Sequence, residues 1–214
     1  MPAGAAPGRR GYDSSGRRDQ ARIRRAAALD ACLTLFLERG FAATTMHAVA
    51  ERAGVSAEML YKSIGPKAAL AKAVWDVTLA GDDEPLAIAD RPVLRDIFAT
   101  PGAEAKLAAY ARFVCAVNER LAPLAAVLLA GGSDAAQVVA ETDAERLTGL
   151  RSFVGHFATE GLLAADANPT TVADARWALT GPDLFARLTR DRGWPAQQYQ
   201  NWLATMLEIS ATTS

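Results

Sequence analysis

The hydrophobic and polar positions of this chain follow helical periods along most of its length. From Ile23 to Phe36, apolar residues recur at intervals of three and four, which places them on one face of a helix. Gly40 then suits the C-terminal end of that helix, because glycine readily adopts the left-handed conformation found there. The pattern therefore predicts a first helix over residues 23–39.

Two short helices joined by a tight turn are predicted next. Residues 46–53 form a partly apolar run that follows Thr45, a good helix-starting residue, and ends at Gly54. Ser56 can cap a second short helix over residues 57–62. Two short helices joined by a glycine-containing turn make a helix-turn-helix pattern.

The rest of the chain also divides into helices at turn signals. Gly65-Pro66 interrupts the chain, and Pro66 fits the first turn of a helix over residues 67–79. No stretch shows the alternation of a strand, and no repeat of fixed period is present, so the sequence predicts an all-α fold. Further helices are predicted over residues 93–98, 103–121, 134–159, 168–190 and 196–209, with another that opens at Pro123 and ends at Gly131-Gly132.

Charge divides the chain into a basic front and an acidic back. Residues 1–70 hold 11 Lys/Arg and 6 Asp/Glu, whereas residues 71–214 hold 12 and 18, although the whole chain has a formal net charge of −1. A basic front suggests a polyanionic partner, although a solvated basic tail would give the same excess. Residues 1–20 are rich in Gly, Ala, Pro and Arg with little to bury, which predicts a disordered basic tail.

Composition narrows the class of protein. Half of the residues are hydrophobic and 22% are charged, as in soluble globular proteins. No apolar run approaches the roughly 18 residues that a membrane span needs, and no secretory signal begins the chain, so we expect a cytoplasmic protein. Cys32 and Cys115 lack the spacing of a zinc or disulfide site. The common nucleotide-binding, metal-binding and nucleophile motifs are missing, so we expect no enzyme, no cofactor and no metal.

A set of residues at particular spacings lies around the predicted helix-turn-helix. It comprises Ala27, Leu33, Phe36, Gly40, Phe41, Thr44-Thr45, Val49-Ala50, Ala53-Gly54-Val55-Ser56, Leu60-Tyr61 and Lys67 with Leu70. With these residues, the stretch 23–70 resembles the TetR family of bacterial transcriptional regulators. Near the other end, Trp177-Ala178-Leu179-Thr180 with Pro182, and Arg192-Gly193-Trp194 with Tyr199 and Trp202, are more loosely similar to the C-terminal domain of one branch of that family.

The resemblance implies an all-helical homodimer of about nine helices with two functional parts. Residues 21–68 would form the helix-turn-helix DNA-binding domain, and residues 69–214 a helical domain that binds a small effector and dimerises through the last two helices. An apolar stripe on those helices fits such a contact, although an intramolecular core would use the same residues. The stripe consists of Leu184, Phe185, Leu188, Trp202, Leu203, Met206 and Leu207.

The resemblance also implies which residues contact DNA. Thr45, Tyr61 and Lys67 would contact phosphates, which fixes the register without reading the sequence. Lys62 can donate to guanine, Glu58 can accept from cytosine or simply face solvent, and Leu60 is expected in the core. The implied DNA-binding residues are Thr45, Met46, Ser56, Ala57, Glu58, Tyr61, Lys62 and Lys67.

The effector is the least defined part of the sequence. Aromatic and polar residues of the predicted C-terminal helices are candidates for a pocket, although at helical spacing aromatic residues often belong to the core. The candidate ligand-binding residues are Trp75, Tyr110, Phe113, Asn118, Arg151 and Trp177. His156 lacks companions for a metal site.

Together, these features predict a TetR-like repressor that binds a palindromic double-stranded DNA operator and is released by a small molecule. The alternative is a helical sensor or interaction protein that does not bind DNA specifically. Salt-dependent, sequence-specific DNA binding would separate the two.

Overall fold

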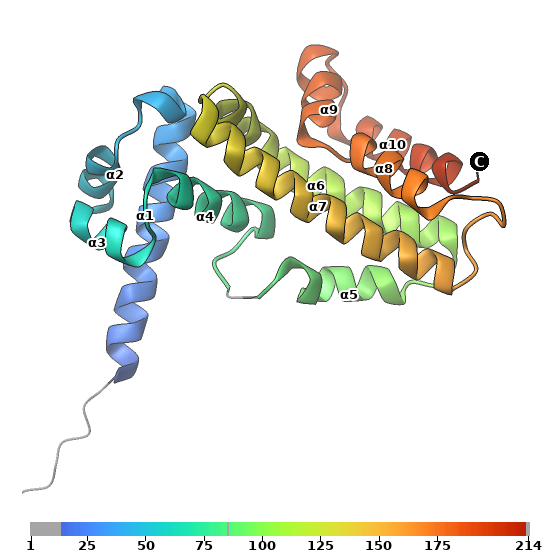
Figure 1. Cartoon of the computed structure of the whole chain (residues 1–214), viewed down its shortest axis with the longest axis horizontal. Helices are drawn as coiled ribbons and strands as arrows, with labels where there is room; N and C mark the ends of the chain where they lie inside the picture. Colours follow the sequence, from blue (N-terminus) through green and yellow to red (C-terminus); the bar gives the residue numbers. More distant parts are fainter. Residues whose placement is uncertain (1–13, 85, 213–214) are drawn as a thin grey trace, which may run out of the picture.

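The computed structural model of this chain describes residues 14–84 and 86–212, and its regular elements within these ranges are all helical (Figure 1). The predicted all-α fold is therefore confirmed. The elements are α1 (Ser14–Ala43), α2 (Met46–Ala53), α3 (Ala57–Ser63), α4 (Lys67–Ala80), the 3₁₀ turn η1 (Ile88–Asp90), α5 (Pro92–Ala99), α6 (Ala103–Leu129), α7 (Ser133–Thr159), α8 (Pro169–Leu179), α9 (Pro182–Ala186), the π turn η2 (Arg187–Asp191) and α10 (Ala196–Thr212). No described helix has the length and apolarity that crossing a bilayer requires.

The first four helices form a head around one hydrophobic core. Gly40, with φ of 82°, interrupts α1 before its last turn. Gly54, with φ of 66°, takes the left-handed conformation that ends α2 and turns the chain into α3. Phe36 and Leu60 are fully buried where α1 and α3 meet the same core.

The remaining helices form an elongated body in which α6 and α7 run side by side (Figure 1). Helix α10 packs along α6, α8 packs along α7, and α5 lies on another side of α6. A second core fills this body, with Leu107, Phe157 and Leu203 each fully buried. Body and head share α4, which contacts α1, α6 and α7.

An arginine fastens the C-terminal end of α4 to the body. Arg120 of α6 donates from Nε to the carbonyl oxygen of Thr78 (3.2 Å) and from Nη2 to that of Leu79 (3.1 Å). Its Nη1 also donates to the carbonyl oxygen of Ala116 on α6 itself (2.9 Å). The last carbonyl groups of a helix have no partner within the helix, so this arginine serves as the cap of α4.

Three predicted boundaries are wrong. Residues 14–20 are helical rather than disordered, since α1 begins at Ser14 and its first turns extend into solvent; residues 1–13 of the predicted tail lie outside the described ranges. Pro123 does not start a helix but lies within α6, on an exposed position where water can satisfy the carbonyl group that loses its N–H partner. The predicted helix 168–190 ends at Leu179, because Pro182 restricts the residue before it and starts α9.

Candidate nucleic-acid interface and ligand cavity

Two capping hydroxyl groups lie at the exposed starts of α2 and α3. Thr45 Oγ1 accepts from the backbone N–H of Ala48 (3.1 Å), and Ser56 Oγ accepts from that of Met59 (3.1 Å). Accepting these bonds uses only oxygen lone pairs, so each hydroxyl hydrogen can still be donated outward. Both side chains are exposed, and the geometry suits contact with an anionic oxygen such as a phosphate.

Helix α3 exposes its polar side chains to solvent and is held to the core of the head by one buried leucine. Leu60 is fully buried, as expected for a core residue. Glu58 and Lys62 are exposed, Tyr61 is 56% exposed, and Ala57 is half-buried. The face therefore offers a carboxylate acceptor, a phenol and an ammonium donor on one short rigid helix.

Met46 is not part of this exposed face. Its side chain is 7% exposed and packs in the core of the head, so it is not placed to reach a base. The expectation that Met46 reads bases is therefore wrong: the first residue of α2 faces inward because its side chain completes the core between α1 and α2.

Lys67 lies where α4 starts, and it binds protein groups. Its Nζ donates to the carbonyl oxygens of Phe41 (2.8 Å) and Thr44 (3.0 Å) and lies 4.1 Å from the centre of the Phe41 ring. An ammonium group has three hydrogens, so one remains for a phosphate. Lys67 thus joins the start of α4 to the segment between α1 and α2.

A surface ion pair, not expected from the sequence, braces α2 against α1. Arg52 donates through Nη1 and Nη2 to the two carboxylate oxygens of Glu38, at 2.8 Å and 3.1 Å. The hydrogen bonds from Arg52 lower the pKa of Glu38 below its usual value. The two residues are 14 positions apart, so no local spacing could have indicated the pair.

The body encloses a cavity of about 180 Å³ between α4, α5, α6 and α7. Four of the six candidate ligand-binding residues line it: Trp75, Tyr110, Phe113 and Asn118. Arg151 does not, because it points from α7 into solvent. Trp177 is not in the cavity lining either, but it lines a neighbouring hollow that shares Trp75, Arg146 and Pro182 with the cavity.

Two charged residues missed by the sequence reasoning, Glu145 and Arg146, also line the cavity, and each is paired with a residue outside its lining. Arg146 donates to Asp143 (2.8 Å) and to the carbonyl oxygen of Trp177 (2.6 Å). Glu145 forms an ion pair with Lys72 of α4, with 3.1 Å between Oε2 and Nζ. The spacing of Asp143 and Arg146, three residues apart in a predicted helix, was the one signal available in the sequence.

The phenol of Tyr110 faces the cavity without a hydrogen-bond partner among the described residues. Its ring stacks on Phe153, with ring centres 4.4 Å apart. Burial away from bulk water raises the pKa of Tyr110 to about 12, although part of its surface is open to the cavity. The hydroxyl therefore stays protonated at neutral pH and remains a donor.

Two buried cations lie beyond the cavity. Lys106 donates to the carbonyl oxygen of Phe98 (2.9 Å), contacts His156 Nε2 (2.8 Å) and pairs with Glu160. Arg176 is fully buried, 4.7 Å from the centre of the Phe157 ring, and its Nε and Nη1 have no partner. Desolvation lowers the pKa of Arg176 to about 10, so it is still charged at neutral pH.

Comparisons with known proteins agree with this geometry. The family described as "Bacterial regulatory proteins, tetR family" matches residues 28–74, which contain the helix-turn-helix. No curated protein sequence matches the chain.

Several solved structures share the fold over most of the chain. A TetR-family regulator from Rhodococcus sp. is 19% identical, with a TM-score of 0.70 over 89% of this chain and 99% of its own. FadR from Bacillus subtilis, in complex with stearoyl-CoA, is 16% identical, with a TM-score of 0.67 over 86% and 98%. NalD from Pseudomonas aeruginosa, the secondary repressor of the MexAB-OprM multidrug efflux pump, is 18% identical, with a TM-score of 0.67 over 91% and 99%.

These matches agree with the resemblance seen in the sequence. The similarity to the solved structures concerns the fold, whereas the family match concerns the helices that carry Thr45, Ser56, Tyr61 and Lys62. Residues 28–74 therefore match the model of the TetR family, and the whole chain has the fold of solved TetR-family transcriptional regulators.

Proposed function

We propose that this protein is a repressor that binds a palindromic operator as a homodimer and releases it when a small molecule enters the body. The observation that supports the proposal is that α3 exposes its polar side chains while Leu60 of the same helix is buried in the core of the head. Helix α4 of the same head also lines the cavity. The domains follow this division, with residues 21–68 reading DNA and residues 69–214 holding effector and partner.

On DNA, the residues divide into positioning and reading groups. Thr45, Ser56 and Tyr61 donate hydroxyl hydrogens to phosphates, and the third hydrogen of Lys67 adds a charged contact. Lys62 donates to guanine in the major groove, and Glu58 accepts from the amino group of cytosine. Ala57 packs on a thymine methyl group.

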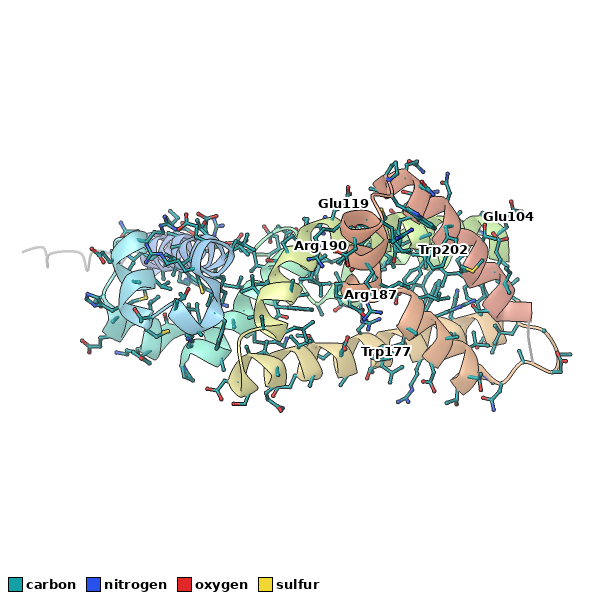
Figure 2. All side chains as sticks on the ribbon, turned by 90° about the horizontal axis from the view of Figure 1, so that it is seen from above. Glu104, Glu119, Trp177, Arg187, Arg190 and Trp202 are labelled. Carbon is teal, nitrogen blue, oxygen red and sulfur yellow. The ribbon has the colours of Figure 1, made fainter. Side chains whose placement is uncertain are left out.

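The proposed dimer uses the last two predicted helices, of which the first is divided into α8, α9 and η2 and the second is α10; the residues of the stripe lie on α9, η2 and α10. Phe185, Leu203 and Leu207 are buried in the core of their own subunit, so they do not belong to the contact surface. Four residues of the predicted stripe remain partly exposed: Leu184, Leu188, Trp202 and Met206. Figure 2 shows Trp177 and Trp202 on α8 and α10, in the part of the molecule remote from α2 and α3, which leaves both heads available for two half-sites.

Release follows from α4, which touches both the cavity and the head. Trp75 and Leu79 of α4 line the cavity, and Lys67 of the same helix holds the segment between α1 and α2. A ligand that favours one position of α4 changes the distance between the two heads of the dimer, so that they no longer match the two half-sites of the operator. Because coupling between two sites is reciprocal, operator DNA weakens ligand binding by the same factor.

The proposal is tested by selecting genomic fragments that bind the full-length protein and measuring anisotropy with the best fragment and a scrambled duplex. We expect a two-fold symmetric site, two chains per site, and an affinity that falls steeply with salt, by a slope of about −0.9 per phosphate contact. Equal affinity for both duplexes, or no fragment enriched, would instead identify a helical sensor or interaction protein.

Lys62→Ala is expected to relax specificity at one base pair of each half-site. Its exposed ammonium is placed to read guanine, and losing it should cost about 1–3 kcal/mol at that position alone. Affinities for a panel of single-base operator variants measure this effect. Tyr61→Phe is the comparison, since loss of a phosphate contact weakens binding to every duplex alike; a uniform loss in Lys62→Ala would remove Lys62 from the reading group.

A further inference from the structure

The cavity in the body carries enough chemistry to define its ligand. We propose that it binds a small, neutral, single-ring aromatic compound whose hydrogen-bond acceptor receives the hydroxyl hydrogen of Tyr110. This inference rests on the proposed function, in which the cavity holds the effector, and it adds the chemical class of that effector.

Volume limits the ligand to one ring with a short substituent. The cavity measures about 180 Å³. An apolar protein cavity of roughly 150 Å³ is known to hold one benzene molecule. The space beyond benzene is enough for a substituent of a few atoms, whereas a long acyl chain does not fit without movement of the walls.

The walls favour an aromatic ring over other shapes. Five aromatic side chains surround the space, and four of them already contact one another, with Phe98 and Phe153 at 5.5 Å and Tyr110 and Phe113 at 6.1 Å between ring centres. A further ring can join the cluster by the same offset or edge contacts. The aromatic lining residues are Trp75, Phe98, Tyr110, Phe113 and Phe153.

The charges around the cavity favour a neutral ligand. Arg146 donates four of its five N–H hydrogens to Asp143, Thr180 and the carbonyl oxygen of Trp177, and the carboxylate of Asp143 already balances its charge, so at most one hydrogen is left for an anion. The other charged lining residue, Glu145, is exposed and would repel an incoming carboxylate. An anion in this space would lose its hydration without gaining a counter-ion, which is strongly unfavourable.

Hydrogen bonding gives the ligand its polar feature. Asn118 Nδ2 donates one of its two hydrogens to the carbonyl oxygen of Thr180 (3.1 Å), and Thr142 Oγ1 donates to the carbonyl oxygen of Val139 (2.9 Å). The hydroxyl of Tyr110 and the indole N–H of Trp75 have no partner among the described residues, and both groups are donors. A ketone, ether or similar neutral acceptor on the ring therefore complements the lining.

The competing ligand is an aromatic acid that reaches Arg176. The guanidinium carbon of Arg176 lies 5.7 Å from the centre of the Phe153 ring, and Phe153 lines the cavity. Arg176 itself is outside the lining, so a carboxylate would reach it only if Phe153 swung aside. The test below includes this acid.

The experiment is isothermal titration of the full-length, DNA-free protein with three probes of similar size: acetophenone, ethylbenzene and benzoate. We expect acetophenone to bind most tightly, ethylbenzene more weakly and benzoate least. Tyr110→Phe should weaken acetophenone binding roughly twofold to thirteenfold, the value of one neutral hydrogen bond, while ethylbenzene binding stays unchanged. Thr148→Val, which removes an exposed hydroxyl of α7 outside the cavity lining, should bind acetophenone as the unaltered protein does.

Each contrary outcome overturns the inference in a recognisable way. Benzoate binding that is tightest, and that is lost in Arg176→Met, would assign an anionic ligand. Equal losses for acetophenone and ethylbenzene in Tyr110→Phe would show that the hydroxyl has no recognition role. No binding of any probe would reject the class. Since DNA is absent, these results are independent of whether the protein is a repressor, which the fragment selection decides.

Discussion

Leu60→Ala is expected to lower the free energy of unfolding by about 2–5 kcal/mol, the usual range for a leucine deleted from a packed core. Leu60 is fully buried and is the only residue of α3 in the buried class among those described. The cavity left behind would loosen α3 from α1, so specific DNA binding should be lost as well. Urea unfolding monitored by circular dichroism measures the first effect, and anisotropy on the selected fragment measures the second.

The control for this prediction is the same chemical change at an exposed site. Leu37 lies on α1 and is 48% exposed, so Leu37→Ala should change stability by less than about 0.5 kcal/mol. Similar losses for both variants would show that α3 is not anchored through Leu60.

Lys67→Met is expected to lower both the stability of the head and the affinity for every duplex. The change removes a charged donor from the carbonyl oxygens of Phe41 and Thr44. The oxygen of Phe41 keeps the N–H of Thr44 (3.2 Å), whereas the oxygen of Thr44 loses its one donor among the described contacts. Leaving such an oxygen unpaired costs about 1–3 kcal/mol, and the proposed phosphate contact disappears as well. Operator and scrambled DNA should therefore bind more weakly by similar factors, and unfolding should begin at lower urea.

Lys72→Met is the matched control, since Lys72 lies on the same helix. Its ammonium pairs with Asp76 (2.6 Å) and Glu145 (3.1 Å), of which Asp76 is 50% and Glu145 62% exposed. Surface pairs of this kind contribute about 0–1 kcal/mol, so stability should change little. A Lys67→Met variant that loses DNA affinity with unaltered stability would mean that its carbonyl contacts do not hold the head.

Local signals explain why the head could be predicted from sequence alone. Thr45, Ser56 and Gly54 act on groups within four residues of themselves, through N-caps and a left-handed turn. The buried position of Leu60 was implied by the resemblance to the TetR family. The predicted α2 boundaries and the α3 N-cap agree with the structure, because no distant contact competes with these short-range rules.

Long-range contacts explain what the sequence did not reveal. The acceptors of Lys67 lie 26 and 23 residues before it, and no spacing rule connects them. On α7, Arg146 and Arg151 look equivalent in a sequence, yet five residues at 100° each separate them by about 140° around the helix. One therefore lines the cavity while the other faces solvent, and only the packing of α7 decides which.

Arg120 holds the C-terminal end of α4 in place, so the helix can tilt about that end while its N-terminal end moves. From Thr78 to Lys67 the helix measures about 16 Å, so a tilt of about 5° at the C-terminal end displaces Lys67 by about 1.4 Å. Hydrogen bonds to bases and phosphates tolerate changes of only about half an ångström. A small shift of the cavity wall near the C-terminal end of α4 therefore becomes a larger shift at Lys67, where the proposed DNA contacts lie.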